Sequence, residues 1–321
     1  MTAGDAPALT GVWRQLLARP TSVPHPADNP PSTCRIALGA ALFRDTRLSR
    51  HGDRSCASCH DPDRAFTDGR ATAAAHDGSA LARNTPSLLD VAFATSLHWD
   101  GRVGSLEEQA WLPIAAPDEM AGQWPRIAAA LDADRELRAA FAAAFPTSPT
   151  ISAANLAKAL AAYERTLVSP PNRLDRWVAG DDDALDADEL AGLALFVGKA
   201  GCVGCHSGWR LTDGRMHDIG LATGPEDAPR AMRTPALRGV ARTGPFMHDG
   251  SKPTLADVID HYSGGFIRRP TLSGNVVRGL TLDAAEKRRL VAFLEALSPE
   301  PVTPPLPSIR QHCLSSGPAG G

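Results

Sequence analysis

Cys56-Ala57-Ser58-Cys59-His60 and Cys202-Val203-Gly204-Cys205-His206 are two copies of the pattern C-x-x-C-H. In this pattern two cysteines form thioether bonds to porphyrin vinyl groups, and the adjoining histidine becomes the proximal ligand of the iron. Structural zinc sites also use C-x-x-C pairs, but this histidine spacing is not that of a zinc finger. The sequence therefore predicts two covalent c-type haems. The first is attached through Cys56, Cys59 and His60, and the second through Cys202, Cys205 and His206.

Length and composition are those of a globular chain of two domains. The chain has 321 residues, of which 43% are hydrophobic, and its net charge is −3. No apolar run approaches the length of a transmembrane helix, so we expect no membrane span. Because the charge is slightly negative and there is no basic block, we expect no nucleic-acid partner.

The N-terminus and two spare cysteines bear on the cellular compartment. Residues 1–5 lack the basic start and apolar core of a signal peptide. Covalent haem is normally installed outside the cytoplasm, so we expect a periplasmic protein whose export signal is not part of this sequence. Cys34 and Cys313 remain after the haem motifs are assigned, and in an oxidising compartment they could pair. Two free thiols are the alternative.

Apolar residues at helical spacing predict an all-α fold of two class I cytochrome c-like domains, each with one covalent c-type haem. Ser105-Leu106-Glu107-Glu108 is a capping-box pattern that predicts a helix start. No convincing alternating strand is present. We expect an extended arm over residues 1–33, an N-terminal haem domain over 34–170, a C-terminal haem domain over 171–300 and a tail over 301–321. The other helices are predicted within 33–44, 127–145, 152–168, 186–199 and 281–297.

With these motifs in place, the chain resembles the bacterial dihaem cytochrome c peroxidase and MauG superfamily. The resemblance runs from about Leu38 to Leu297. It falls closest to the MauG-like branch, within which an MbnH-like protein is one alternative. The stretches that carry it are residues 37–43, 55–60, 83–89, 99–102, 105–110, 233–238 and 245–250.

The resemblance implies that the first haem reacts with hydrogen peroxide. Glu119, ten residues after Gln109, corresponds to the family's distal glutamate, and Gln109 and Pro113 would line the same pocket. A carboxylate there can move a proton between the two peroxide oxygens before the O–O bond breaks, which is worth about 10²–10⁴ in rate. His76 lies sixteen residues after His60, where classical peroxidases have a removable haem ligand. It could be that ligand or an ordinary loop histidine.

The resemblance also assigns a residue between the haems and a sixth ligand for the second haem. Trp99 corresponds to the tryptophan that relays charge between the haems. Classical peroxidases have a methionine fourteen residues after the histidine that corresponds to His248, and here that position is Tyr262. A phenolate lowers the haem potential, whereas methionine raises it. His261 is the main competing ligand and Met247 a weaker one.

By the same resemblance, one calcium ion lies between the haems. Asn84, Thr243 and Pro245 match its protein ligands, and oxygen donors of this kind suit calcium.

The function implied is that of a dihaem enzyme that reacts with hydrogen peroxide, forms a high-valent state and oxidises a Trp or Tyr residue of a partner protein by long-range electron transfer. The first alternative is a classical cytochrome c peroxidase that takes electrons from a small redox protein. The second is a dihaem electron carrier without enzyme activity. MauG has a tryptophan just before its second haem motif, whereas this chain has Lys199-Ala200-Gly201. Trp177 and Trp209 are therefore candidate stations for electron transfer to the surface.

Overall fold

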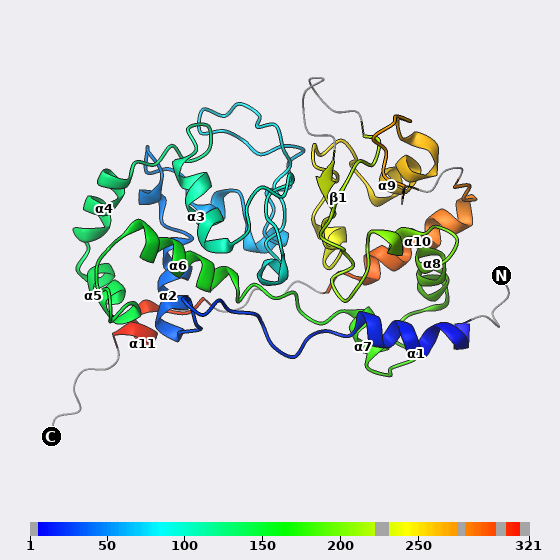
Figure 1. Ribbon diagram of the computed structural model, residues 1–321, viewed down its shortest axis with the longest axis horizontal. Coiled ribbons are helices and arrows are strands. Elements are labelled where there is room, and N and C mark those ends of the chain that lie inside the picture. Colours follow the sequence, from blue (N-terminus) through cyan, green and yellow to red (C-terminus); the bar gives the residue numbers. More distant parts are fainter. Residues whose placement is uncertain (1–5, 222–230, 275, 277–279, 300–305, 315–321) are drawn as a thin grey trace.

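The computed structural model describes residues 6–221, 231–274, 276, 280–299 and 306–314. Within these ranges the chain forms two helical lobes side by side (Figure 1). The first lobe contains α2 (Thr33–Leu42), α3 (Leu106–Ala115), α4 (Trp124–Asp132), α5 (Arg135–Ala144), α6 (Ala153–Glu164) and α11 (Ile309–Cys313). The second contains α1 (Ala6–Leu17), α7 (Arg173–Val178), α8 (Ala187–Val197), α9 (Leu255–Asp260) and α10 (Ala284–Ala296).

Short elements occupy the long loops around these helices. A two-stranded antiparallel sheet, which the sequence analysis did not predict, pairs Met216 with Arg233 and His217 with Met232. Its strands are β1 (Met216–His217) and β2 (Met232–Arg233). The 3₁₀ helices are η1 (Thr46–Leu48), η2 (Cys56–Ser58), η3 (Pro62–Arg64), η4 (Val91–Phe93), η5 (Cys202–Gly204) and η6 (Val240–Arg242), and η7 (His261–Gly265) is a π-helix.

Local sequence explains where the helices begin. The side chain of Ser105 accepts a hydrogen bond from the backbone N–H of Glu108 at 3.2 Å, which caps α3 as predicted. Asp186 and Asp283 cap α8 and α10 in the same way, each as part of a capping box. The predicted helical regions are therefore confirmed as α2 to α6, α8 and α10.

In each lobe the helix that precedes the haem motif packs tightly on a later helix through a glycine. A Cβ atom at Gly39 of α2 would lie 1.9 Å from the carbonyl oxygen of Ala159 on α6. A Cβ at Gly192 of α8 would lie 2.0 Å from the carbonyl oxygen of Arg289 on α10. Only glycine permits such an approach, so these two positions fix how the helices cross beside each haem motif.

The first and the last helix of the described residues pack on opposite lobes. Residues 6–17 are helical, so the prediction of a fully extended arm over residues 1–33 was wrong for this part. Leu17 is buried in the second lobe's core, and Trp13 packs against that core. Burial of this apolar face stabilises a helix that the sequence analysis had missed. At the other end, α11 packs on α2 and α5 of the first lobe (Figure 1).

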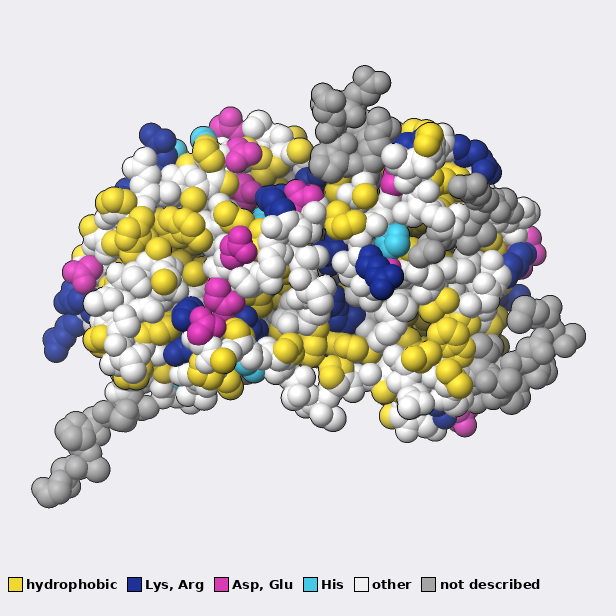
Figure 2. Space-filling view, in the orientation of Figure 1, with side chains coloured by type: hydrophobic (Ala, Val, Ile, Leu, Met, Phe, Trp, Pro, Cys, Tyr) yellow, Lys and Arg dark blue, Asp and Glu magenta, His cyan; other side chains and the backbone are white. Residues whose placement is uncertain are grey.

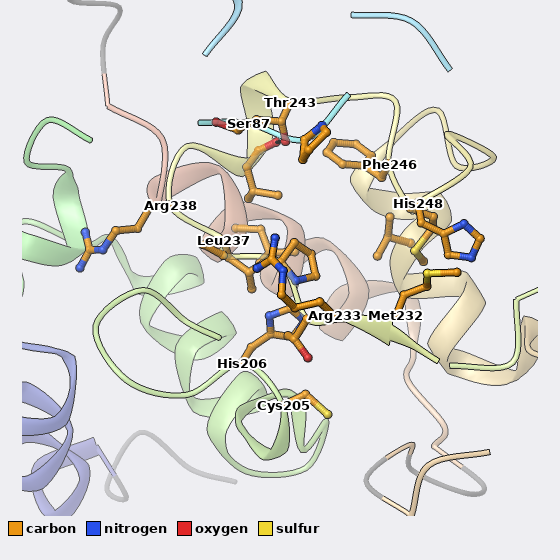
Figure 3. A pocket seen from close by; sticks show the side chains of 18 of the residues that line it. Ser87, Cys205, His206, Met232, Arg233, Leu237, Arg238, Thr243, Phe246 and His248 are labelled. Carbon is orange, nitrogen blue, oxygen red and sulfur yellow. Dashed lines mark hydrogen bonds between the residues drawn. The ribbon is translucent and has the colours of Figure 1, made fainter. Parts of the chain in front are cut away.

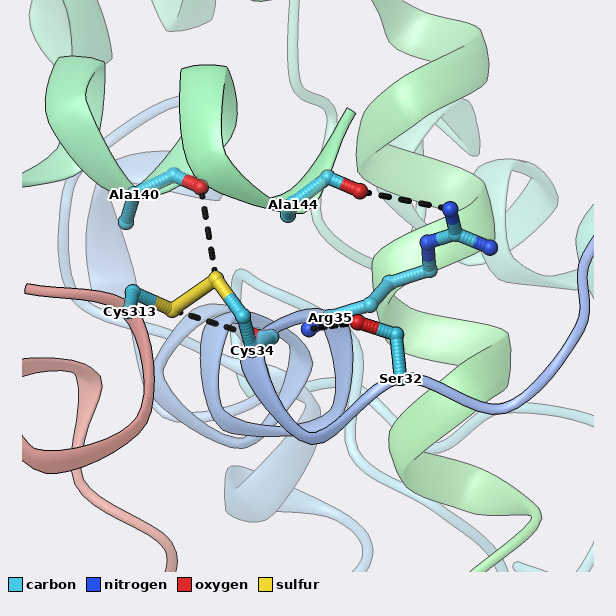
Figure 4. The surroundings of a disulfide bond; sticks show 6 residues. All are labelled: Ser32, Cys34, Arg35, Ala140, Ala144 and Cys313. Atoms are coloured by element: carbon cyan, nitrogen blue, oxygen red, sulfur yellow. Dashed lines mark hydrogen bonds between the residues drawn. A yellow bond between two sulfur atoms is a disulfide. The ribbon is translucent and has the colours of Figure 1, made fainter. Parts of the chain in front are cut away.

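A disulfide bond joins Cys34 of α2 to Cys313 of α11 (Figure 4). This confirms the pairing of the two cysteines that the haem motifs leave over. Both residues are buried in the first lobe's core. The bond therefore holds the segment that follows the second lobe against the first lobe.

Two further observations concern the charges on one face of the molecule and the lengths of the described helices. On the face in Figure 2, basic and acidic side chains are interspersed among hydrophobic atoms, so this face carries no extended patch of one sign. None of the helices in the described ranges has the length and hydrophobicity that crossing a membrane requires.

Candidate haem sites

Each C-x-x-C-H motif lies in the wall of a cavity, and the local backbone is the same in both. Cys56–Ser58 and Cys202–Gly204 form single 3₁₀ turns. The backbone N–H of His60 donates to the carbonyl of Cys56 at 2.9 Å, and that of His206 to the carbonyl of Cys202 at 2.8 Å. The tight turn brings both cysteines and the histidine of each motif to one cavity.

Both motif histidines are held ready to bind a metal through one nitrogen. Nδ1 of His60 lies 3.0 Å from the carbonyl oxygen of Phe66, and Nδ1 of His206 lies 2.9 Å from that of Leu211. A carbonyl only accepts, so each Nδ1 carries the proton and each Nε2 keeps its lone pair. Burial lowers the pKa of both histidines, so both rings are neutral. Neutral imidazole is the form that ligates iron.

The first cavity contains the predicted peroxide-handling residues. Glu119, Gln109 and Pro113 line it together with His60. Gln109 and Pro113 project from α3, and Glu119 follows in the turn after that helix. Burial and the neighbouring Asp118 raise the pKa of Glu119, against a smaller opposing effect of Arg102. A carboxyl group with a raised pKa is a stronger base when ionised, which favours proton transfer from a substrate.

His76 lies apart from these residues. It is absent from the lining of the first cavity. Its ring, which is half-buried, packs against that of His51 with a centroid separation of 5.8 Å, and its backbone N–H donates to the carbonyl of Asp118. In this conformation the loop would have to move before His76 could reach the first haem.

Of the two neighbouring candidates for the sixth ligand, only Tyr262 faces the second cavity. Tyr262 lines this cavity with His206 and Met247, whereas His261 does not. The His261 ring is buried, and its Nε2 lies 2.9 Å from the carbonyl oxygen of Ile219. Tyr262 belongs to the π-helix η7, which extends α9, and π-turns often occur at functional sites. Burial raises the pKa of its phenol.

Figure 3 gives the arrangement of the second cavity. Cys205 and His206 lie together at one end, Thr243 and Ser87 at the opposite end, and Met232 and His248 to one side. Apart from the motif residues, the lining is largely apolar, with Leu237, Phe246 and Ile259 among its members. An apolar cavity with a few polar groups is typical of a cofactor site.

One wall is shared by both cavities and contains Trp99. The indole N–H of Trp99 donates to the carbonyl of Asn84 at 2.8 Å. The carbonyl of Trp99 in turn accepts from the backbone N–H of Arg233 in the second lobe at 2.7 Å. Trp99 is therefore fixed between the two cavities. The residues that line both are Asn84, Thr85, Pro86, Ser87, Val91, Trp99 and Arg233.

Unpartnered polar atoms test whether a haem fits these cavities. Nε of Arg210 and Nε2 of His98 are buried without a hydrogen-bond partner, and these residues line the second and the first cavity respectively. Burial lowers the pKa of Arg210 to about 10, which leaves it cationic at neutral pH. Haem carries two propionate carboxylates, which such groups can bind. Together with the motif histidines, these residues fit one haem in each cavity.

The residues predicted for calcium are partly brought together. The side-chain nitrogen of Asn84 lies 3.2 Å from the carbonyl oxygen of Pro245. It also lies 2.8 Å from the carbonyl oxygen of Arg70 and 3.2 Å from that of Ala71. Thr243 lines the second cavity, as Asn84 and Pro245 do. Three carbonyl oxygens thus converge on one side chain at the boundary between the lobes.

Sequence reasoning missed a buried acid in the first cavity. Glu164, the last residue of α6, lines the cavity one turn after Leu160. Its Oε2 is buried without a partner. The signal available in the sequence was an acidic residue on the face that α6 otherwise fills with Leu156, Leu160 and Tyr163.

Comparisons with known proteins agree with these features. Residues 33–183 match the family described as di-haem cytochrome c peroxidase. The chain is 44% identical to methylamine utilization protein MauG of Methylorubrum extorquens over 91% of this chain and 86% of that protein. It is 37% identical to cytochrome-c peroxidase IdrP1 of Denitromonas iodatirespirans, over 86% of this chain and 84% of that protein.

A solved structure supports the same assignment. The crystal structure of a MauG-like protein associated with microbial copper homeostasis has a TM-score of 0.80 and 33% identity, and covers 88% of this chain and 95% of that one. The mostly helical fold and the prediction of two haems agree with this family. The chain thus belongs to the di-haem cytochrome c peroxidase and MauG family, and it is an enzyme of that family.

Proposed function

We propose that this protein is a MauG-like enzyme that reacts with hydrogen peroxide at the first haem and oxidises a Trp or Tyr side chain of a partner protein. The observation that carries this proposal is that Tyr262 lines the second cavity with His206, while His261 is turned away and hydrogen-bonded elsewhere. A tyrosine ligand would favour oxidised iron. The second haem would then hold an oxidising equivalent rather than collect electrons from a carrier.

When bound, the haems supply the redox chemistry that cleaves the O–O bond and stores the oxidising equivalents. Reduction of one peroxide to two waters takes two electrons and two protons. Glu119 would take a proton from one oxygen of bound peroxide and return it to the other oxygen, which leaves as water. Gln109 lines the same pocket and would donate a hydrogen bond to bound peroxide, and Pro113 would limit the size of the pocket. The raised pKa of Glu119 supports this role.

Trp99 provides the route between the haems. Its indole is held by the carbonyl of Asn84, and its ring contacts that of His248 edge-to-face with a centroid separation of 6.3 Å. A fixed aromatic group in the wall shared by the two cavities shortens each step of electron transfer. Its position supports a relay rather than a purely structural role.

The route from the second haem to the partner avoids Trp177 and Trp209. The guanidinium of Arg14 lies over the Trp177 ring at 4.7 Å, and those of Arg19 and Arg238 lie over Trp209 at 5.5 and 5.1 Å. A cation over the ring stabilises the neutral indole but repels the radical cation left when an electron departs. At the position before the second motif, Lys199 pairs with Glu286 at 2.6 Å. Direct transfer from the haem edge is therefore favoured.

We propose in addition that the protein binds calcium and is located in the periplasm. Rotation of the Asn84 amide would turn its oxygen toward the carbonyls of Arg70, Ala71 and Pro245, which would complete an all-oxygen cluster with Thr243. The disulfide between Cys34 and Cys313 supports an oxidising compartment.

The test is to add hydrogen peroxide to the fully oxidised holoenzyme and record the spectrum from the visible to the near infrared. A near-infrared charge-resonance band without added reductant is expected. Activity only after one-electron reduction would replace the proposal with a classical peroxidase fed by a small redox protein. No spectral change would leave a dihaem electron carrier without enzyme activity.

A further inference from the structure

The first cavity contains an ionisable group that the peroxide chemistry above does not use. Glu164 is 5% exposed, and its Oε2 has no hydrogen-bond partner in the described structure. It lines the cavity together with Cys56 and His60. Among the charges that act on the Cys56 sulfur, that of Glu164 has the largest effect, so the carboxyl lies near this edge of the cavity. Burial of an ionised carboxylate without a partner costs free energy, so this group is expected to be neutral or to interact with the charge of the haem.

The charges around Glu164 do not neutralise it. Its chain neighbour Arg165 donates to both carboxylate oxygens of Glu107 on α3, at 2.7 and 2.9 Å, and is therefore already paired. Arg165 and Glu107 act on Glu164 with opposite signs. The face of α2 that packs on α6 is apolar. The remaining ionisable groups in the cavity wall are Arg54, Cys59, His60, Arg83, His98, Asp100, Arg102, Asp118, Glu119 and Arg233.

From this placement we infer that Glu164 takes up a proton when the first haem gains an electron and releases it when the haem is oxidised. In one such step a one-electron donor reduces the iron, and one proton from solvent binds the carboxylate of Glu164. The net charge of the buried site then stays constant. Glu164 acts on the first haem through its charge and makes no contact with peroxide. The inference does not depend on which substrate the enzyme oxidises.

The coupling between proton binding at Glu164 and electron binding at the first haem sets the size of the expected change in potential. Burial raises the pKa of Glu164 to about 8, so its protonation changes across the neutral to mildly alkaline range. Electron and proton binding are reciprocal, so the potential of the first haem must fall as pH rises. A tenfold change in proton activity corresponds to about 59 mV for a one-electron couple. The slope is therefore expected to be largest in the range around pH 8, with about 59 mV per pH unit as its upper limit for one proton and one electron.

The experiment measures the midpoint potential of the first haem against pH in the holoenzyme, by spectroelectrochemistry between pH 6 and 10. Glu164→Gln keeps the shape of the side chain and removes the proton site. Glu108→Gln is the matched control, since Glu108 is an exposed acid on α3. Glu119→Gln tests whether the partly buried Glu119, another acid of the cavity wall, takes up the proton instead. We expect the slope around pH 8 to vanish in Glu164→Gln and to persist in the other two.

Two results would overturn the inference. One is a slope that is unchanged in Glu164→Gln. The other is a slope that disappears in Glu119→Gln alone, which would assign the proton to Glu119. If Glu164→Gln does not fold, redox difference infrared spectra of the wild-type protein and of Glu164→Asp give a second reading. A protonated-carboxyl band that changes with reduction and shifts in Glu164→Asp supports the inference, and a spectrum without such a band contradicts it.

Discussion

Removal of the disulfide between Cys34 and Cys313 is expected to weaken the whole molecule. The two cysteines are 279 positions apart, so the bond closes a loop that spans most of the chain. Loop-closure entropy for a loop of this length gives a ceiling of about 5.6 kcal/mol at 25 °C, and measured disulfides typically contribute about 2–4 kcal/mol. Since α11 packs on α2 and α5, its release also exposes apolar surface. We expect a loss of about 2–4 kcal/mol, or about 3–6 °C in Tm for a chain of this length.

The assay is thermal unfolding followed by far-ultraviolet circular dichroism on the wild type and on the double variant Cys34→Ser/Cys313→Ser, each with and without a thiol reductant. Serine is close to cysteine in size, and the haem thioethers are not reduced by thiols. The reductant should lower the Tm of the wild type to that of the double variant and leave the double variant unchanged. Equal Tm values for the two oxidised proteins would refute the reasoning.

Four other changes test separate parts of the structure. Glu119→Gln should slow the reaction with peroxide by about 10²–10³ in stopped-flow experiments, because the proton shuttle is lost; an equal rate would remove Glu119 from the chemistry. Tyr262→Met should raise the potential of the second haem and shorten the life of the peroxide-oxidised state, and an unchanged lifetime would count against Tyr262 as a ligand. The hydrogen-bonded ion pair with Arg269 lowers the pKa of Asp218 to about 2, so its stabilisation is present above about pH 4 and is lost as the pH falls toward 2. Asp218→Asn should therefore cost about 2 kcal/mol of unfolding free energy at pH 7 and almost nothing at pH 2, and a cost that does not vary with pH would be inconsistent with this ion pair. Gly39→Ala should destabilise by about 1–3 kcal/mol because its Cβ would overlap the carbonyl of Ala159, whereas Gly104→Ala, at a position with open space, should be nearly neutral; similar losses would argue against the close crossing of α2 and α6.

The sequence was informative where one local rule decides the structure. The haem motifs depend on short spacings, and helices such as α3 begin at caps such as Ser105, so they could be located without coordinates. The helix over residues 6–17 was missed because its stability comes from packing on the second core, which no local pattern records. The pairing of β1 with β2 was missed for a similar reason, since each strand has only two residues.

Within the site, the sequence identified residues more readily than their orientation. It left Tyr262 and His261 as competing ligands, because adjacent positions differ only in the direction of the side chain. The π-turn and the carbonyl of Ile219 separate the two, and neither can be inferred from spacing. Glu164 was overlooked because a single acid at the end of an apolar helix face usually points to solvent. Its burial depends on how α6 meets the cavity.

The central claim is that the two haems are ligated differently and that only the first is open to peroxide. The most direct measurement is a crystal structure of the fully oxidised holoenzyme. We predict that the oxygen of Tyr262 binds the iron held by His206, and that the iron held by His60 has no protein side chain on its other face. Two irons with the same pair of ligands, or Tyr262 away from the second iron, would contradict the claim.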